Sequence, residues 1–430
     1  MSLTRQSVCQ PKHSMKPMIK YSYLLGLITA SAIFFQFHVA LPAGLINLNL
    51  ADPFAMLSFF ILLVNALFFK RLPQWRIAEF NWILILFGVL LLTAYVIGWM
   101  KIGVTQWALS ARLVGWVVLL GYLSAGYLIV AYLGDKGIRR LLEVLATTAI
   151  VVIVWSITVR LLYGYGFDVS EPTHNFEGFS GNRNAFAFQL LAILALTLAY
   201  SKTYNLRAGS VNVRFLSAWQ SWVPLGFLFA GIIWSASRAG VLAAVVVLMV
   251  AGYKKIVDRR LLLLGVLFAV LLWLLIFILQ YLGPDNSTVQ SQISSADSNQ
   301  ERWATLFYGF EMWRLSPFFG EGLGVFIANS TERFGHPTVI HNTPLWILAE
   351  LGLVGALVLG WSFLKLWGYS IKAVSTQDEL SRSALLLLLI AFIVFSQFHE
   401  MLFQRIIWLV GGALLGSQMV FRHQILAKAG

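Results

Sequence analysis

Long apolar runs separated by short polar connections make up most of the sequence. A helix needs about 20 mostly apolar residues to cross the hydrocarbon core of a bilayer, and these runs are close to that length. They lie near residues 21–45, 53–69, 77–100, 113–133, 141–164, 185–200, 216–236, 239–253, 261–283, 342–364, 384–401 and 406–421. The pattern predicts an all-α integral membrane protein with about 12 transmembrane helices.

The composition supports this prediction and excludes two other classes of protein. Hydrophobic residues make up 59% of the chain and charged residues only 11%, against roughly a quarter charged in soluble globular chains. A large soluble domain is therefore excluded. The net charge of +13 is scattered in small groups between the apolar runs, as topology signals are, so we also exclude nucleic-acid binding.

The distribution of basic residues predicts the orientation of the chain. We interpret the first run as a retained helix rather than a signal peptide, because its apolar stretch is long and its exit is a poor cleavage site. With a cytoplasmic amino terminus, most of the 31 Lys and Arg residues fall on the inner side, as the positive-inside rule requires. Both termini are expected in the cytoplasm.

This orientation divides the chain into five parts. They are a basic cytoplasmic tail (1–20), spans one to nine (21–283), a large outer loop (284–341), spans ten to twelve (342–421) and a second cytoplasmic tail (422–430). The outer loop is longer than a structureless connection usually is, so we expect it to be partly folded and functional. The inner connections are short and lack a Walker-type glycine loop, which excludes a cytosolic nucleotide-driven engine.

The sequence of the outer loop predicts a helix within the loop. A polar entry (284–299) precedes a helix from about residue 300 to 315, capped by Ser298 or Asn299. Its aromatic and apolar residues recur at helical spacing, so the helix is expected to lie on the outer membrane surface. These residues are Trp303, Leu306, Phe307, Phe310 and Trp313. Arg302 and Arg314 border this face, where they either bind an anionic substrate or reach toward lipid headgroups.

Two further features of the loop are candidates for chemistry. Gly320, Gly322 and Gly324 predict a turn, with a phosphate cradle as a weaker alternative. Asn342 is a good N-cap and Pro344 fits a first helical turn, so the tenth span is predicted to begin here with its positive end outward. Asn342 is also expected to contact the substrate.

The histidines beside this helix start are candidates for a general base. His341 stands next to the free N–H groups of the tenth span, a position that suits an anion and a base together. The alternative is a headgroup-level histidine without a task. His336 is a second candidate, as base or in substrate binding.

Arg238 is the most informative arginine, because the apolar run that follows it is short. The run 239–253 is expected to span less than the hydrocarbon core, so Arg238 should lie in a cavity below the outer surface. A phosphate-bearing ligand is a suitable partner for such a cation, and a distant carboxylate, Glu350 or Glu400, is the alternative.

Arg183 and Asn184 open the sixth span at the same face, where we expect Arg183 to bind substrate and Asn184 to cap the helix or bind substrate. His38, His174, His399 and Arg405 are interpreted as interface or loop structure. No tight group of acidic residues and histidines accompanies the site, so we expect neither a catalytic metal nor another cofactor.

Four segments together resemble the O-antigen ligase and polymerase superfamily. They are 181–187 (GNRNAFA), 237–240 (SRAG), 302–324 and 341–355 (HNTPLWILAELGLVG). The resemblance covers roughly residues 180 to 360 together with the twelve-span layout. It rests on the order and outer placement of the segments, since no single one is specific.

The resemblance implies a donor, a partner and a location. Members transfer a glycan from undecaprenyl diphosphate on the periplasmic side of the bacterial inner membrane. The acceptor is a lipid A–core sugar for ligases, another lipid-linked glycan for polymerases, or a protein in a related branch. We favour the ligase branch. By motif, the family's two arginines and histidine correspond to Arg238, Arg302 and His341.

The implied mechanism agrees with the chemistry of these side chains. The arginines hold the diphosphate while His341 deprotonates the acceptor hydroxyl, and one direct displacement inverts the sugar C1. A flippase for the same lipid-linked glycan is the rival from another class. It has no use for a base in a large outer loop, which favours the transferase.

Overall fold

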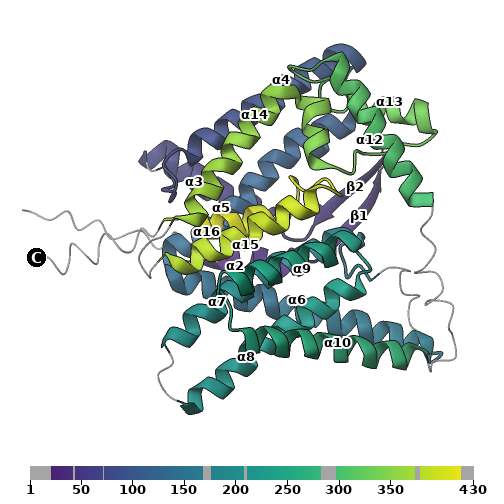
Figure 1. The fold of residues 1–430 in the computed structure, drawn as a ribbon. Helices are drawn as coiled ribbons and strands as arrows, with labels where there is room; N and C mark the ends of the chain where they lie inside the picture. Colours follow the sequence, from purple (N-terminus) through teal and green to yellow (C-terminus); the bar gives the residue numbers. More distant parts are fainter. Residues whose placement is uncertain are drawn as a thin grey trace, which may run out of the picture.

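The computed structural model describes residues 21–41, 44–70, 72–167, 176–207, 211–281, 297–372 and 378–417. Within these ranges the chain is a bundle of helices with a small antiparallel hairpin, and α12, α13 and the hairpin lie at one end of the bundle (Figure 1, right). The apolar helices of the bundle are α2 (Ser22–Ala32), α3 (Asp52–Phe69), α4 (Phe80–Ile102), α5 (Gly115–Leu133) with the π-helix η1 (Trp107–Val114) before it, α6 (Asp135–Gly164), α7 (Arg183–Arg207), α8 (Val211–Trp234), α9 (Arg238–Tyr253), α10 (Arg259–Tyr281), α14 (Thr343–Ile371), α15 (Glu379–Ser396) and α16 (Arg405–Leu415).

Each predicted apolar run contains one of these helices, which confirms an all-α membrane protein. Among the described residues, seven helical stretches are long and apolar enough to cross a membrane, and five shorter apolar helices occupy the remaining runs. The prediction of twelve complete crossings stays a prediction. The helix expected from about residue 300 to 315 is confirmed as α12 (Asp297–Leu315), but the expected cap at Ser298 or Asn299 is wrong, because the helix begins before both residues. A further short helix, α13 (Val325–Phe334), follows it.

The first predicted span, 21–45, is wrong in its second half. Helix α2 ends at Ala32, and strands β1 (Gln36–Leu41) and β2 (Gly44–Asn49) follow as an antiparallel pair. Polar residues alternate with apolar ones in Gln36–Val39 and in Ile46–Asn49, a period of two that a helix cannot place on one face, and the sequence Pro42-Ala43-Gly44 favours a turn. The hairpin is tied to the segment before α7, where the Gln36 N–H donates to the Phe179 carbonyl (3.1 Å).

Helix α14 is broken at Gly352, which has a left-handed backbone (φ 67°). The segment that follows α12 fills the break. The N–H groups of Leu353 and Val354 donate to the carbonyls of Pro317 and Phe318 (2.9 and 3.0 Å). A Cβ atom at Gly352 would collide with the Phe318 carbonyl, so only glycine fits. Backbone hydrogen bonds therefore attach α12 to α14.

Buried apolar side chains form two clusters rather than one. The larger cluster draws mainly on α5, α6, α7, α9, α15 and α16. The smaller cluster draws mainly on α4, α13 and the first half of α14, with Met312 of α12. Close packing in the larger cluster depends on small residues. At Gly126 of α5 and Gly412 of α16, an added Cβ would strike the backbone of the partner helix.

Candidate active site

Three helices begin with capped N-termini at the same site. Asn182 Oδ1 accepts from the N–H groups of Asn184 and Ala185 at the start of α7 (2.9 and 3.2 Å). Ser237 Oγ accepts from the Gly240 N–H at the start of α9 (3.2 Å), and Asn342 Oδ1 from the Leu345 N–H at the start of α14 (2.8 Å). The predicted cap at Asn342 is thus confirmed. Helix N-termini carry partial positive charge, so this end of the bundle favours anions.

The capping role expected of Asn184 is wrong, because the side chain of Asn182 already satisfies the free N–H groups of α7. The Asn184 side chain turns to α9 instead, where its Oδ1 accepts from Ser237 Oγ (2.7 Å). This hydrogen bond fixes the starts of α7 and α9 to each other. It also sets the positions of Arg183 and Arg238, which are the first residues of these two helices.

Arg183, Arg238 and Arg302 form a cationic cluster. Arg302 is half-buried in the second turn of α12. Burial lowers its pKa, and the charges of Arg183 and Arg238 lower it further. Guanidinium groups nevertheless stay protonated in proteins, so three positive charges from α7, α9 and α12 face one region. Such an arrangement suits a polyanion.

The carboxylates considered as alternative partners of Arg238 are engaged elsewhere. Glu350 accepts from Trp346 Nε1 (2.8 Å) and from the Gly324 N–H (3.2 Å). Glu400 forms a bidentate ion pair with Arg112 of η1 (2.5 and 2.6 Å). The side chain of Arg238 itself is exposed at the first turn of α9. Neither of these two carboxylates is therefore the partner of Arg238, and its anion-binding role stays a prediction.

His341 lies beside this cluster, two residues before α14. Burial lowers its pKa, and the charge of Arg302 lowers it further. The imidazole is therefore neutral near pH 7 and able to accept a proton. His336 differs, because its side chain is 57% exposed and faces the Glu301 carboxylate at 3.8 Å. The environment of His341 is the better suited of the two to a general base.

His399 is a member of the site that sequence reasoning missed. It follows the end of α15, is only 8% exposed, and its ring centroid is 6.0 Å from that of His341. Burial, with the charges of Arg302, His341 and Arg183, lowers its pKa to about 3. The predicted topology places residue 399 at the outer end of its span. This placement at the outer face was the one indication that His399 belongs to the site, and no local sequence pattern relates His399 to His341.

Hydrogen bonds fix the connection that carries His399 to the start of α14. The Asn342 side chain donates to the Gln397 carbonyl (2.9 Å). Thr343 Oγ1 donates to the His399 carbonyl (2.7 Å) and accepts from the Met401 N–H (2.9 Å). Asn342 therefore shapes the site through the protein chain, in addition to any contact with substrate.

Two other predicted features lie apart from the cluster. Arg314 is exposed in the last turn of α12, twelve residues and about 18 Å along the helix from Arg302. The phosphate cradle is not supported either, because the N–H groups of the glycine run already donate to protein oxygens. The pairs are Gly320 to Ser316, Glu321 to Ala349, Gly322 and Gly324 to Glu350, and Leu323 to Ala94. The run serves as the predicted turn.

The apolar face of α12 is exposed, as expected for a helix at a membrane surface. Trp303, Phe307 and Phe310 are 63%, 66% and 47% exposed. The Leu306 side chain, expected on the same face, has intermediate exposure to solvent. An exposed aromatic stripe of this kind is typical of helices that rest in the headgroup region.

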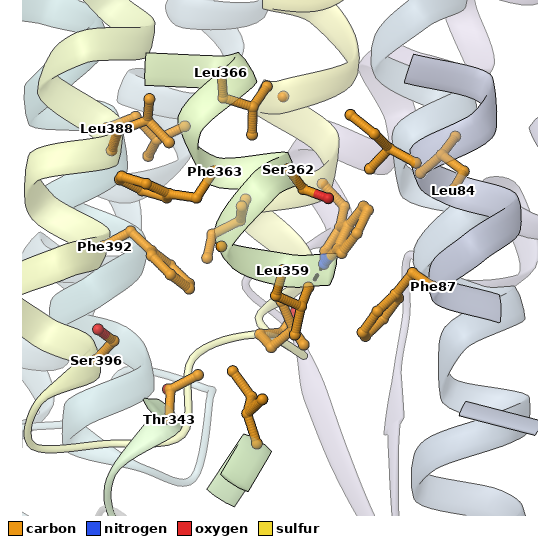
Figure 2. A pocket seen from close by; sticks show the side chains of 18 of the residues that line it. Leu84, Phe87, Thr343, Leu359, Ser362, Phe363, Leu366, Leu388, Phe392 and Ser396 are labelled. Atoms are coloured by element: carbon orange, nitrogen blue, oxygen red, sulfur yellow. Dashed lines mark hydrogen bonds between the residues drawn. The ribbon is translucent and has the colours of Figure 1, made fainter. Parts of the chain in front are cut away.

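An apolar pocket of about 380 Å³ begins at the start of α14 and runs between α4, α14, α15 and α16 (Figure 2). Thr343 and Ser396 lie at one end of it and Leu366 and Leu388 at the other, with Phe363 and Phe392 between them. Apolar side chains make up nearly all of its wall. The pocket therefore suits a hydrocarbon chain whose polar end lies near Asn342.

Within the described part of the chain, no group of three or more His, Cys, Asp and Glu side chains is placed to hold a metal ion. The chemistry that this site offers comes from imidazoles and guanidinium groups. His174, interpreted above as loop structure, lies outside the described residues.

Comparison with known proteins finds a similar family for part of the chain. Residues 223–360 match the family model described as O-antigen ligase. The matched segment contains Arg238, Arg302, His341 and Asn342, and it confirms the predicted resemblance. No curated protein sequence matches the chain significantly.

Proposed function

Because residues 223–360 match the family model described as O-antigen ligase, we propose that the chain belongs to that superfamily and transfers a glycan from undecaprenyl diphosphate to a hydroxyl of a lipid A–core sugar. The reaction takes place on the periplasmic face of the bacterial inner membrane, with both termini of the chain in the cytoplasm. One observation carries the proposal: the half-buried imidazole of His341 lies within the electrostatic reach of Arg302, which itself lies within reach of Arg183 and Arg238. A base beside a polyanion site is what glycosyl transfer from a diphosphate requires.

The arginines and the histidine have different roles in the proposed reaction. Arg238 and Arg302, with Arg183, bind the diphosphate and neutralise the charge that develops on it as its bond to the sugar C1 breaks. His341 takes the proton from the acceptor hydroxyl, whose oxygen forms the new bond to C1. The electron pair of the broken bond leaves with undecaprenyl diphosphate. Attack and departure occur on opposite faces of C1, so the configuration inverts.

The apolar pocket supports the choice of a polyprenyl donor. The end of the pocket at Thr343 adjoins the residues that begin α14 (Figure 2). A prenyl chain in this pocket places its diphosphate toward His341 and the arginines. Diphosphate is a good leaving group, so the proposed reaction needs neither a nucleotide nor a metal ion.

Ligase and polymerase activities differ in the acceptor, and protein is a third acceptor within the superfamily. The lipopolysaccharide pattern of a deletion strain distinguishes the first two. A ligase predicts that complete glycan accumulates on its lipid carrier and that the core stays bare. A core that carries one repeat unit indicates a polymerase instead, and an unchanged lipopolysaccharide with unglycosylated protein indicates the third branch.

Reconstitution separates a transferase from a flippase. Purified protein in detergent, without a bilayer to cross, is expected to join a donor glycan to a lipid A–core acceptor. A protein that moves the donor across vesicles and forms no product in detergent contradicts the proposal.

A further inference from the structure

The imidazoles of His341, which is half-buried, and His399, which is buried, share an unusual property. Within the described residues, no protein group forms a hydrogen bond with a ring nitrogen of His399 or of His341. The His399 residue is only 8% exposed, yet its ring nitrogens are not among the fully covered side-chain atoms that lack a partner. They are therefore open to a ligand, which can supply the hydrogen-bond partner that the protein does not.

The rings are arranged to share one ligand atom. Their centroids are 6.0 Å apart and their planes are nearly perpendicular, at 79°. One oxygen atom at ordinary hydrogen-bond length from a nitrogen of each ring fits ring centres that are about 6 to 8 Å apart. The spacing therefore matches a single hydroxyl between the two imidazoles, whereas the rings are too far apart for a direct hydrogen bond.

Contacts of its backbone and of its ring fix the position of His399 relative to His341. Its carbonyl accepts from Thr343 Oγ1 at the start of α14 (2.7 Å), and its ring packs on Phe395 with 5.2 Å between centroids. The next residue, Glu400, is paired with Arg112. An imidazole fixed this firmly is preorganised to orient a ligand.

We propose that His399 is the second imidazole of the acceptor site and donates a hydrogen bond to the acceptor hydroxyl while His341 removes the hydroxyl proton. The inference rests on the proposed function. The acceptor oxygen uses one lone pair to accept from the His399 N–H and the other to attack the sugar C1. Its own hydrogen points to His341. His399 neither gains nor loses a proton in this step, in keeping with its low pKa.

Kinetics of purified full-length protein test this assignment. His399→Phe keeps the aromatic packing on Phe395 but removes both ring nitrogens. We expect kcat/KM for the acceptor to fall about 10-fold or more, with the Kd for the undecaprenyl-diphosphate-linked donor within about 2-fold of wild type. His399→Gln, which keeps an N–H donor, is expected to recover part of the loss.

Phe398→Leu is the matched control, because it changes an exposed neighbour on the same connection, and it should transfer at the wild-type rate. Thermal unfolding of each variant checks that the fold is kept. Wild-type kinetics for His399→Phe overturn the inference. So does an equal loss of donor and acceptor binding, or a His399→Gln variant as impaired as His399→Phe. A wild-type protein that forms no product overturns the proposed function itself, which is a different outcome.

Discussion

Arg112 and Glu400 form a bidentate ion pair that joins the π-helix η1 to the connection between α15 and α16. The two side chains are only 3% and 13% exposed. The guanidinium group also lies over the rings of Trp107, Trp346 and Phe403, at 4.6 to 4.8 Å. The pair is thus buried, and it anchors the residue next to His399.

Removal of either partner of this pair should destabilise the protein. Arg112→Met leaves the Glu400 charge buried alone, which costs about 3–5 kcal/mol. Thermal unfolding in detergent is expected to show a clearly lower Tm together with reduced transfer. The double variant Arg112→Met with Glu400→Leu should recover much of the Tm, because no charge is left unpaired. A single variant as stable as wild type would show that the pair is dispensable.

Activity should persist to a lower pH than an ordinary histidine allows. Transfer needs neutral His341, so the rate falls as pH falls through its pKa. Burial, followed by the charge of Arg302, lowers that pKa, which places the acid limb of kcat/KM below about pH 6.5. Arg302→Gln removes one positive charge, and the limb of its residual activity should move to higher pH. A wild-type midpoint at or above 6.5 contradicts the environment described for His341.

Substitution of the general base and substitution of a diphosphate-binding arginine should change different kinetic constants. His341→Ala is expected to lower turnover about 100-fold or more with donor affinity largely unchanged. Arg238→Ala should weaken donor binding and turnover together, and Arg238→Lys should rescue only partly, because an ammonium group lacks the planar fork of arginine. The measurements compare equal amounts of folded protein. If His336→Ala abolishes transfer while His341→Ala retains it, the base is His336.

Gly352→Ala should be costly, and a second glycine of α14 supplies the control. Alanine at residue 352 must adopt a left-handed backbone, a cost of about 1–3 kcal/mol, and its Cβ collides with the Phe318 carbonyl. We expect a lower Tm and a detached α12. At Gly360, by contrast, an added Cβ meets no atom within 4 Å, so Gly360→Ala should be neutral or mildly stabilising. Equal effects of the two substitutions would rule out this account of the break.

Reporter fusions test the orientation of the chain. A reporter after Tyr253 should indicate the cytoplasm, and one within residues 284–299 should indicate the periplasm. A cytoplasmic signal from the second fusion would move His341 to the cytosol and overturn the site assignment.

The sequence predicted features that depend on local patterns. The helices, the cap at Asn342 and the helix that carries Arg302 all follow from apolar periodicity and capping chemistry. The hairpin was missed because its residues are as apolar as a span, and length outweighed the alternation of polar positions. Composition therefore predicts that a segment is apolar more reliably than it predicts whether the segment is a helix or a strand.

Features that depend on long-range packing could not be predicted. Asn184 and Ser237 are 53 residues apart, and Arg112 and Glu400 are 288 apart. No local pattern records that these side chains meet. The approach of His399 to His341 is of the same kind, since it follows from the way α15 packs beside α14. The same applies to Gly352, because the break in α14 at this residue is explained only by the segment around Phe318 that packs against it.

The site lies between the two buried clusters of the protein. The hydrogen bond from Ser237 to Asn184 joins Arg183 and Arg238 to the cluster of α7 and α9. The backbone bonds at Gly352 join Arg302 and His341 to the cluster of α4 and α14. Each pair of side chains is therefore held in place by a different buried cluster. A donor bound by all three arginines would contact elements of both clusters, so donor binding is expected to couple them.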